Sequence, residues 1–282
     1  MTHGVKTSAE QKHTLAPPQR KPWARLVSQA HRPTGVGPAR VSERWRSGAT
    51  PHGQALTFSY CPCYTQSPRR DSSSIIMTTP DDADFPPDAF EKWDAADDSD
   101  FYVQPRFVTH IDDRAIAALT SFYRETLPTG GVVLDLMSSW VSHLPSDVSY
   151  AEVIGHGMNE AELAANPRLG RRFVLDLNRN PRLPLCDSSV DAAMISVSIQ
   201  YLQQPVAVLC EVARILKPCQ PLVISFSNRC FPTKAVAIWQ ALDDSGHAHL
   251  VALYLRRAGF ADIETRTLCD GRASVSGNSA TY

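Results

Sequence analysis

Two short apolar runs joined by a polar turn constrain the fold of this chain more than any other feature. The first run, residues 173–175, ends at the carboxylate of Asp176, and the second run spans residues 192–197. A helix is predicted after them, over residues 205–216, from apolar side chains at helical spacing. Buried strands with polar groups at their ends are typical of an open α/β sheet, in which ligands bind beyond the strand ends.

The alternation of strands and helices extends over the second half of the chain. Further short apolar strands are predicted over residues 132–137, 152–155, 222–226 and 262–268. Helical patterns are predicted over residues 112–127, 160–165, 233–242 and 247–258. We therefore predict an α/β domain with a doubly wound, mostly parallel sheet over residues 101–270, and an irregular tail over residues 271–282.

The first part of the chain differs in composition from the rest. Residues 1–76 hold eleven Lys or Arg and three Asp or Glu, of 28 and 29 in the whole chain, and show no apolar period. Such a stretch buries too little surface to offset its ordering entropy. We expect a disordered basic tail or an organelle transit peptide, with Met77 as an alternative start. Removing residues 1–76 should then leave stability and ligand binding intact.

Residues 77–100 are strongly acidic, and Pro86-Pro87 breaks any helix there. This composition predicts a solvated linker. The segment also holds several aromatic residues, which are too many for a pure linker. We therefore expect part of it to lie against the domain, over a pocket.

Composition also excludes several classes of function. Outside residues 1–76 acidic residues outnumber basic ones, which argues against nucleic acid as a partner. No apolar run approaches the ~20 residues of a membrane helix, and no secretory signal is evident. The seven cysteines are scattered and lack zinc-site spacing, which indicates a reducing compartment and no metal. We expect a cytoplasmic protein, or a plastid or mitochondrial one if residues 1–76 are a transit peptide.

Four stretches resemble the class I S-adenosylmethionine-dependent methyltransferases of the type 11 kind. They are residues 133–136, residues 153–159, residues 174–191, and residues 215–225 with Ala258-Gly259-Phe260. The resemblance implies that S-adenosylmethionine binds beyond the strand ends, and that Asp176 reaches the adenine amine. The residues it assigns to the cofactor are Asp135, Met137, Ser138, Gly155, Gly157, Asn159, Asp176 and Leu177.

The sequence departs from this family at three places. The turn after the first strand, Met137 to Trp140, has none of the family's glycines, so Trp140 would stack on the ligand, block it, or pack in the core. The family's ribose-binding acid falls on Gly157, which leaves Asn159 or Glu160 to bind the ribose hydroxyls. The antiparallel seventh strand that the family adds at its C-terminus is doubtful, because residues 271–282 are a poor strand.

The resemblance implies in-line transfer of the sulfonium methyl group to a nucleophile of a small-molecule or protein acceptor. A general base is needed only where the acceptor must lose a proton, and the candidates near the strand ends are His156, Tyr201 and Asn228. A lone His or Tyr at such a position is more often a packing or capping residue. The first rival reading is a methyltransferase fold that has lost catalysis and serves as a binding or assembly module. The second is a nicotinamide-dependent Rossmann enzyme, against which the absence of Gly-x-Gly-x-x-Gly counts. The acceptor and the oligomeric state stay open.

Overall fold

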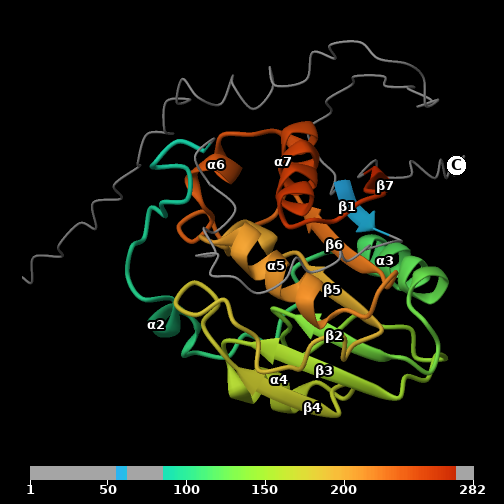
Figure 1. The fold of residues 1–282 in the computed structure, drawn as a ribbon. Coiled ribbons are helices and arrows are strands. Elements are labelled where there is room, and N and C mark those ends of the chain that lie inside the picture. The colour runs from blue at the N-terminus through green and yellow to red at the C-terminus, as the bar shows by residue number, and fades with distance from the viewer. Residues whose placement is uncertain (1–54, 62–84, 271–282) are drawn as a thin grey trace, which may run out of the picture.

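The computed structural model describes residues 55–61 and 85–270, which form one sheet flanked by helices (Figure 1). The sheet has seven strands in the order β4-β3-β2-β5-β6-β1-β7. The strands are β1 (Ala55–Cys61), β2 (Val132–Leu136), β3 (Glu152–Gly157), β4 (Arg171–Val174), β5 (Ala192–Ser196), β6 (Leu222–Ser227) and β7 (Glu264–Asp270). The described helices are α2 (Asp98–Tyr102), α3 (Asp113–Thr126), α4 (Glu160–Ala165), α5 (Pro205–Ile215), α6 (Ala237–Gln240) and α7 (Asp244–Arg257). Ile199–Tyr201 forms a short 3-10 turn.

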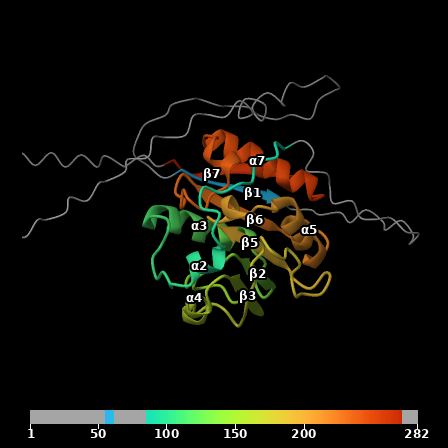
Figure 2. The same cartoon turned by 90° about the vertical axis from the view of Figure 1, so that its left-hand side faces the viewer.

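The strands from β4 to β6 pair in parallel, which confirms the predicted α/β fold with a mostly parallel sheet. Side chains alternate between the two faces of each strand, so Leu134 and Leu136 pack in the core under α5 and α7, whereas Val133 packs under α3. Figure 2 shows α3 and α5 on opposite sides of the sheet. Because both faces of β2, β5 and β6 are covered, these strands need apolar residues at successive positions, and they read as largely apolar runs.

Strand β1 corrects the expectation that all of residues 1–76 form a disordered tail. It lies between β6 and β7 and is antiparallel to both, with Phe58 opposite Ser225 on one side and Arg266 on the other. The antiparallel strand that the resemblance implied at the C-terminus thus comes from the N-terminal part of the chain. The sequence carried a signal for it, since apolar residues alternate with Thr and Ser in Ala55–Cys61. Residues 1–54, 62–84 (with Met77) and 271–282 lie outside the described residues.

Residues 85–111, which we call the strap, correct the expectation of a linker. Phe85 and Ala89 are buried in the core beside α7. The backbone of the strap also bonds to that of residues 233–238, where Ile238 N donates to Ala89 O at 2.8 Å and Ala237 N donates to Glu91 O at 2.8 Å. Buried apolar residues and backbone hydrogen bonds therefore hold this segment against the domain, as we expected for part of it.

The helix predicted over residues 233–242 is restricted to α6. The preceding residues form a turn that ends in a β-bridge between Val236 and Lys92 of the strap. Within the part of the chain that the structure describes, no helix has both the length and the apolar character needed to cross a membrane.

Candidate functional site

A cavity of about 320 Å³ lies beyond the carboxyl ends of β2, β3, β4 and β5 and is bordered by the C-terminal part of the strap. Because these strands are parallel, the residues that follow each of them meet at one edge of the sheet. Most of the predicted cofactor-binding residues line this cavity; they are Asp135, Met137, Ser138, Gly157, Asn159, Asp176 and Leu177. Gly155 lies further back in β3, where a Cβ atom would come within 2.2 Å of the Leu169 side chain.

Asp135 brings a carboxylate to the floor of the cavity at the end of β2. It is 2% exposed and accepts a hydrogen bond from Ser138 Oγ at 2.6 Å. Burial raises the pKa of Asp135 to about 7, against the opposing effect of hydrogen bonds from Ser138 and Ser142. The carboxyl group is therefore poised between its neutral and charged forms near neutral pH, and a nearby cation would shift it to the charged form.

The turn after β2 keeps a glycine-like backbone although it contains no glycine. Met137 has a φ of 59°, in the left-handed region that glycine adopts at little cost. His156 stabilises this turn, because its Nδ1 accepts from Met137 N at 3.1 Å and its carbonyl accepts from Ser138 N at 2.6 Å. The loss of the family's glycines thus does not remove the turn itself.

His156 is unsuited to the predicted role of general base. The side chain is 1% exposed, and its second ring nitrogen, Nε2, donates to Leu175 O at 2.8 Å. Burial lowers the pKa of His156 to about 4, so the ring is neutral with Nδ1 as the acceptor. Since both nitrogens are bonded to the backbone, neither can accept a proton from a substrate. The residue joins the ends of β2, β3 and β4.

The end of β3 has no room for the family's acid. A Cβ atom at Gly157 would lie 2.6 Å from Ser138 O, a backbone atom. Asn159 is the N-cap of α4 and accepts from Glu162 N at 3.0 Å, while its amide donates to Tyr102 O of the strap at 2.8 Å. Glu160, the other residue predicted to bind the ribose in place of the family's acid, lies on the surface, where its Oε1 is 2.7 Å from Arg172 Nε.

Glu162 is a cavity residue that the sequence reasoning missed. It is 8% exposed, lines the cavity, and accepts from Arg106 N of the strap at 2.7 Å. Burial raises the pKa of its carboxyl group. A signal was available, because Asn159 followed three residues later by Glu162 is the pattern of a helix capping box.

Asp176 lies two residues after the end of β4 and lines the cavity. Its Oδ1 accepts from Asn178 N at 2.9 Å in an Asx turn, and its Oδ2 lies 3.7 Å from Arg179 Nε. The neighbouring Leu177 is buried and supplies an apolar wall. Asp176 therefore both forms a turn with Asn178 and lines the cavity.

Residues 138–224 match the family described as a methyltransferase domain. This part of the chain is similar to methyltransferase domains. The match begins at Ser138, within the turn that lacks the family's glycines, and ends in β6. The predicted resemblance to class I methyltransferases of the type 11 kind is thereby confirmed. No curated protein matches the sequence.

Several solved structures are similar to the methyltransferase domain. An S-adenosylmethionine dependent methyltransferase from Mesorhizobium loti is 24% identical, with a TM-score of 0.29 over 36% of this chain and 50% of that chain. A SAM dependent methyltransferase from Aquifex aeolicus is 19% identical, with a TM-score of 0.37 over 50% of this chain and 78% of that chain. Geranyl diphosphate C-methyltransferase from Streptomyces coelicolor was solved with S-adenosyl-L-homocysteine. It is 17% identical, with a TM-score of 0.29 over 36% of this chain and 40% of that chain. The chain spans about half the length of the first of these structures.

The lining of the cavity includes two imidazoles that the sequence reasoning missed. His110 comes from the strap and His143 from the loop after β2, and both line the cavity of the methyltransferase domain. Burial lowers the pKa of His143 to about 4 and also lowers that of His110, so both rings are neutral at pH 7. Among the residues that the structure describes, neither ring has a hydrogen-bond partner. Each ring therefore has a nitrogen that can accept a hydrogen bond from a ligand.

The two other predicted bases are placed less favourably. Tyr201 lines the cavity, but its hydroxyl accepts from Phe231 N at 2.9 Å, and burial raises the pKa of Tyr201 to about 12. The phenol therefore stays protonated at neutral pH. Asn228 lies in the loop after β6 but does not line the cavity, whereas Arg229, which follows it, does.

Trp140 neither fills the cavity nor packs in the core. Its Nε1 donates to Val108 O of the strap at 3.1 Å, and its ring packs edge-on against Phe107 at 6.3 Å between centroids. The side chain therefore attaches the strap beside the cavity and leaves the space beyond β2 open to a ligand.

The buried carboxyl group of Asp135 should make stability depend on pH. The pKa of an aspartate in the unfolded chain is about 3.9, so between pH ~4 and ~7 only the folded state holds this proton. The free energy of unfolding then falls as pH rises, by up to about 4 kcal/mol. Asp135→Asn removes this titration, and we expect its melting temperature relative to wild type to increase from pH 4.5 to 7.5. Thermal melts of both proteins, with the exposed Asp262→Asn as control, measure the effect. A difference that does not change with pH would contradict it.

Proposed function

We propose that this protein transfers the methyl group of S-adenosylmethionine to a small-molecule or protein acceptor. The observation that carries the proposal is the convergence of Asp135, Glu162 and Asp176 on one cavity at the carboxyl ends of adjacent parallel strands. The cavity volume of about 320 Å³ is at the lower end of the range for small-molecule sites. The family match supports the same activity.

The chain's own residues fit the proposed cofactor at both ends. The left-handed backbone of Met137 supports a close approach of the cofactor's methionine part to the turn after β2. Asp176 would accept a hydrogen bond from the adenine amine, with Leu177 against the ring. Gly157 has no carboxylate to bind the ribose hydroxyls, and Glu162, not Glu160, would provide it. Asp135 would compensate positive charge within the buried part of the site.

Methyl transfer requires little covalent chemistry from the protein. When bound, S-adenosylmethionine supplies the methyl group and the sulfur leaving group. The residues of the cavity would hold the acceptor in line with that bond and exclude water. Where the acceptor carries an acidic O–H or N–H, the neutral rings of His110 and His143 are placed to take its proton, in preference to His156, Tyr201 and Asn228.

Substitution of Asp176 tests the cofactor assignment. Asp176→Ala should weaken binding of S-adenosylmethionine and S-adenosylhomocysteine about 10- to 100-fold, because a hydrogen bond to a charged group contributes about 1.5–3 kcal/mol. Isothermal titration calorimetry measures both affinities. Asp176→Asn should lose less, since its carbonyl oxygen can still accept from the amine.

Glu125→Ala, on the exposed surface of α3, is the matched control and should bind both ligands like wild type. If Asp176→Ala binds them with wild-type affinity, the adenine assignment is wrong. If the wild-type protein gives neither heat nor a melting shift at millimolar ligand, the methyltransferase proposal itself fails.

The second candidate function is a binding or assembly module that has lost catalysis. The absence of an acid at Gly157 and of glycines in the turn after β2 favours it. This candidate predicts that the protein binds S-adenosylhomocysteine or nothing, and that no acceptor is methylated when radiolabelled S-adenosylmethionine is offered with a library of small molecules and proteins.

A further inference from the structure

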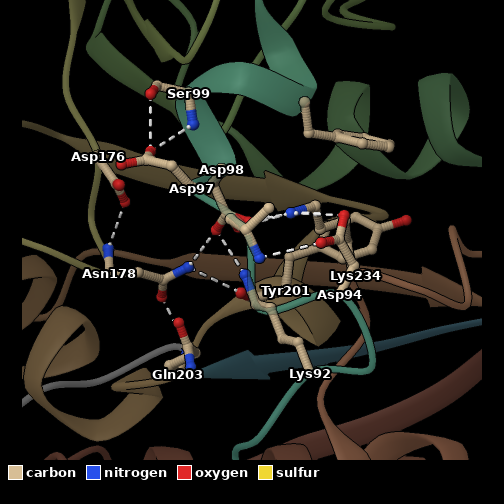
Figure 3. A network of polar contacts seen from close by, with 12 residues as sticks. Lys92, Asp94, Asp97, Asp98, Ser99, Asp176, Asn178, Tyr201, Gln203 and Lys234 are labelled. Carbon is tan, nitrogen blue, oxygen red and sulfur yellow. Dashed lines mark hydrogen bonds and ion pairs between the residues drawn. The ribbon is translucent and has the colours of Figure 1, made fainter.

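We propose that Asp98, held between Lys92 and Lys234, positions the Asp176–Asn178 turn for the adenine end of the cofactor. The strap would then be part of the cofactor site although it lies outside the matched methyltransferase domain. The inference rests on the proposed function, and it assigns a role to Asp98, which is linked to Asp176 through Asn178. Figure 3 shows these side chains directed toward one another from the strap, the turn after β4 and the loop after β6.

The centre of the network is an ion cluster with two buried lysines. Lys234, in the loop after β6, has a fully buried side chain, and Lys92 of the strap is 4% exposed. Lys234 Nζ donates to Ala96 O at 2.8 Å and lies 3.0 Å from Asp94 Oδ2 and 3.4 Å from Asp98 Oδ1. Lys92 Nζ lies 2.5 Å from Asp98 Oδ2. Two positive and two negative charges therefore balance, and each ammonium is compensated.

Such a cluster is weak evidence for stability but strong evidence for a defined arrangement. Desolvation of two lysines offsets much of the attraction, and apolar residues of similar volume would often be as stable. Removing one partner leaves a buried charge without compensation, which is costly. The strap cannot leave the loop after β6 without removing all three acceptors of Lys234. The cluster therefore restrains Asp98 to one position beside the cavity, which Asp98 also lines.

Asn178 connects this cluster to the adenine-side turn. Its Nδ2 donates to Asp98 Oδ2 at 2.9 Å and to Tyr201 O at 3.0 Å, and its Oδ1 accepts from Gln203 N at 2.7 Å. The side-chain amide therefore has both ends bonded in one orientation. Its backbone N–H donates to Asp176 Oδ1 at 2.9 Å, so the position of Asn178 decides which way the Asp176 carboxylate faces. Asp97 of the strap also pairs with Arg179 of the same turn.

The alternative is a cluster that only attaches the strap and has no effect on ligand recognition. The two possibilities differ in discrimination between adenine and hypoxanthine. A correctly oriented Asp176 carboxylate accepts from the 6-amino group of S-adenosylhomocysteine, whereas S-inosylhomocysteine presents a carbonyl oxygen there and is rejected. If Asp98 positions the turn, substituting it should reduce the discrimination between the two ligands. If Asp98 is purely structural, substituting it should change the melting temperature and leave the discrimination unchanged.

The experiment measures the affinities of S-adenosylhomocysteine and S-inosylhomocysteine for full-length wild type, Asp98→Asn and Asn178→Ala by calorimetry. We expect the ratio of the two affinities to fall about 10-fold in both variants, the effect of losing one oriented hydrogen bond to a charged group. Asn178→Ala leaves the ion cluster intact and serves if Asp98→Asn does not fold. Asp100→Asn, an exposed acid of the same helix outside the network, should keep the wild-type ratio.

The outcomes separate the inference from the proposed function. A wild-type protein that discriminates, with variants that discriminate equally well, would overturn the positioning role and leave the proposed function in place. A wild-type protein that binds neither nucleoside would overturn the proposed function and the positioning role together. Loss of discrimination in Asp98→Asn and Asn178→Ala, with Asp100→Asn unchanged, is the result that supports the inference.

Discussion

Gly157→Asp, which restores the ribose-binding acid of the family, should destabilise the domain and abolish cofactor binding. A Cβ atom at this position would lie 2.6 Å from Ser138 O, which real contacts of this kind do not reach. The backbone there cannot move freely, because Ser138 N donates to His156 O at 2.6 Å and His156 joins three strand ends. Overpacking costs about 1–3 kcal/mol and more against backbone. For a domain of this size, 3 kcal/mol corresponds to a fall in melting temperature of about 6–12 °C.

Thermal melts and calorimetry with S-adenosylmethionine measure both effects. Gly157→Ala should lose nearly as much stability as Gly157→Asp, because the Cβ atom and not the charge makes the close contact. Gly170→Asp is the matched control, since a Cβ atom there would approach the Glu152 side chain no closer than 3.7 Å. A stable Gly157→Asp protein that binds the cofactor more tightly than wild type would show that the end of β3 does accommodate an acid.

A chain that begins at Met77 should not fold into a stable domain, because it lacks β1. In the sheet, β1 is the strand between β6 and β7, and its residues pair with both neighbours along most of its length. Its loss removes roughly ten backbone hydrogen bonds at about 0.5–1.5 kcal/mol each, against a total stability of about 5–15 kcal/mol. It also leaves β7, whose Cys269 belongs to the core under α3, without a neighbour in the sheet.

Circular dichroism melts of the two chain lengths test this expectation. We expect the Met77 chain to show no cooperative transition, or one lowered by more than ~10 °C. A truncation that removes only residues 1–50 keeps β1 and is the matched control. Phe58→Pro in the full chain should reproduce much of the loss, because proline removes a ladder hydrogen bond in an inner strand. A Met77 chain as stable as the control would show that β1 contributes nothing, as the composition of residues 1–76 had suggested.

The strands and their polar ends could be predicted because their signals are local. Strands β2 and β5 are largely apolar runs of the kind that a parallel sheet covered on both faces requires. Asp135 lies near the end of β2, and Asp176 directly follows the apolar residues 173–175. Parallel pairing then places both carboxylates at one edge, so the sequence by itself determined the fold class and the edge at which a ligand would bind. It also indicated a resemblance to class I methyltransferases, and the family match over residues 138–224 supports that resemblance.

The tertiary structure alone decided which polar groups reach the cavity and in what state. In the sequence, His156 and His143 are both single histidines that follow a predicted strand. Both ring nitrogens of His156 bond to backbone groups at neighbouring strand ends, whereas His143 lines the cavity without such bonds to the described residues. Glu160 and Glu162 are two residues apart on α4, so a helical rotation of about 200° places one on the surface and one at the cavity. The positions of β1 and the strap depend on pairing with residues more than a hundred positions away, such as Ser225 and Lys234. Local pattern carries no information about such contacts, because their free energy arises only when the distant partner is already in place.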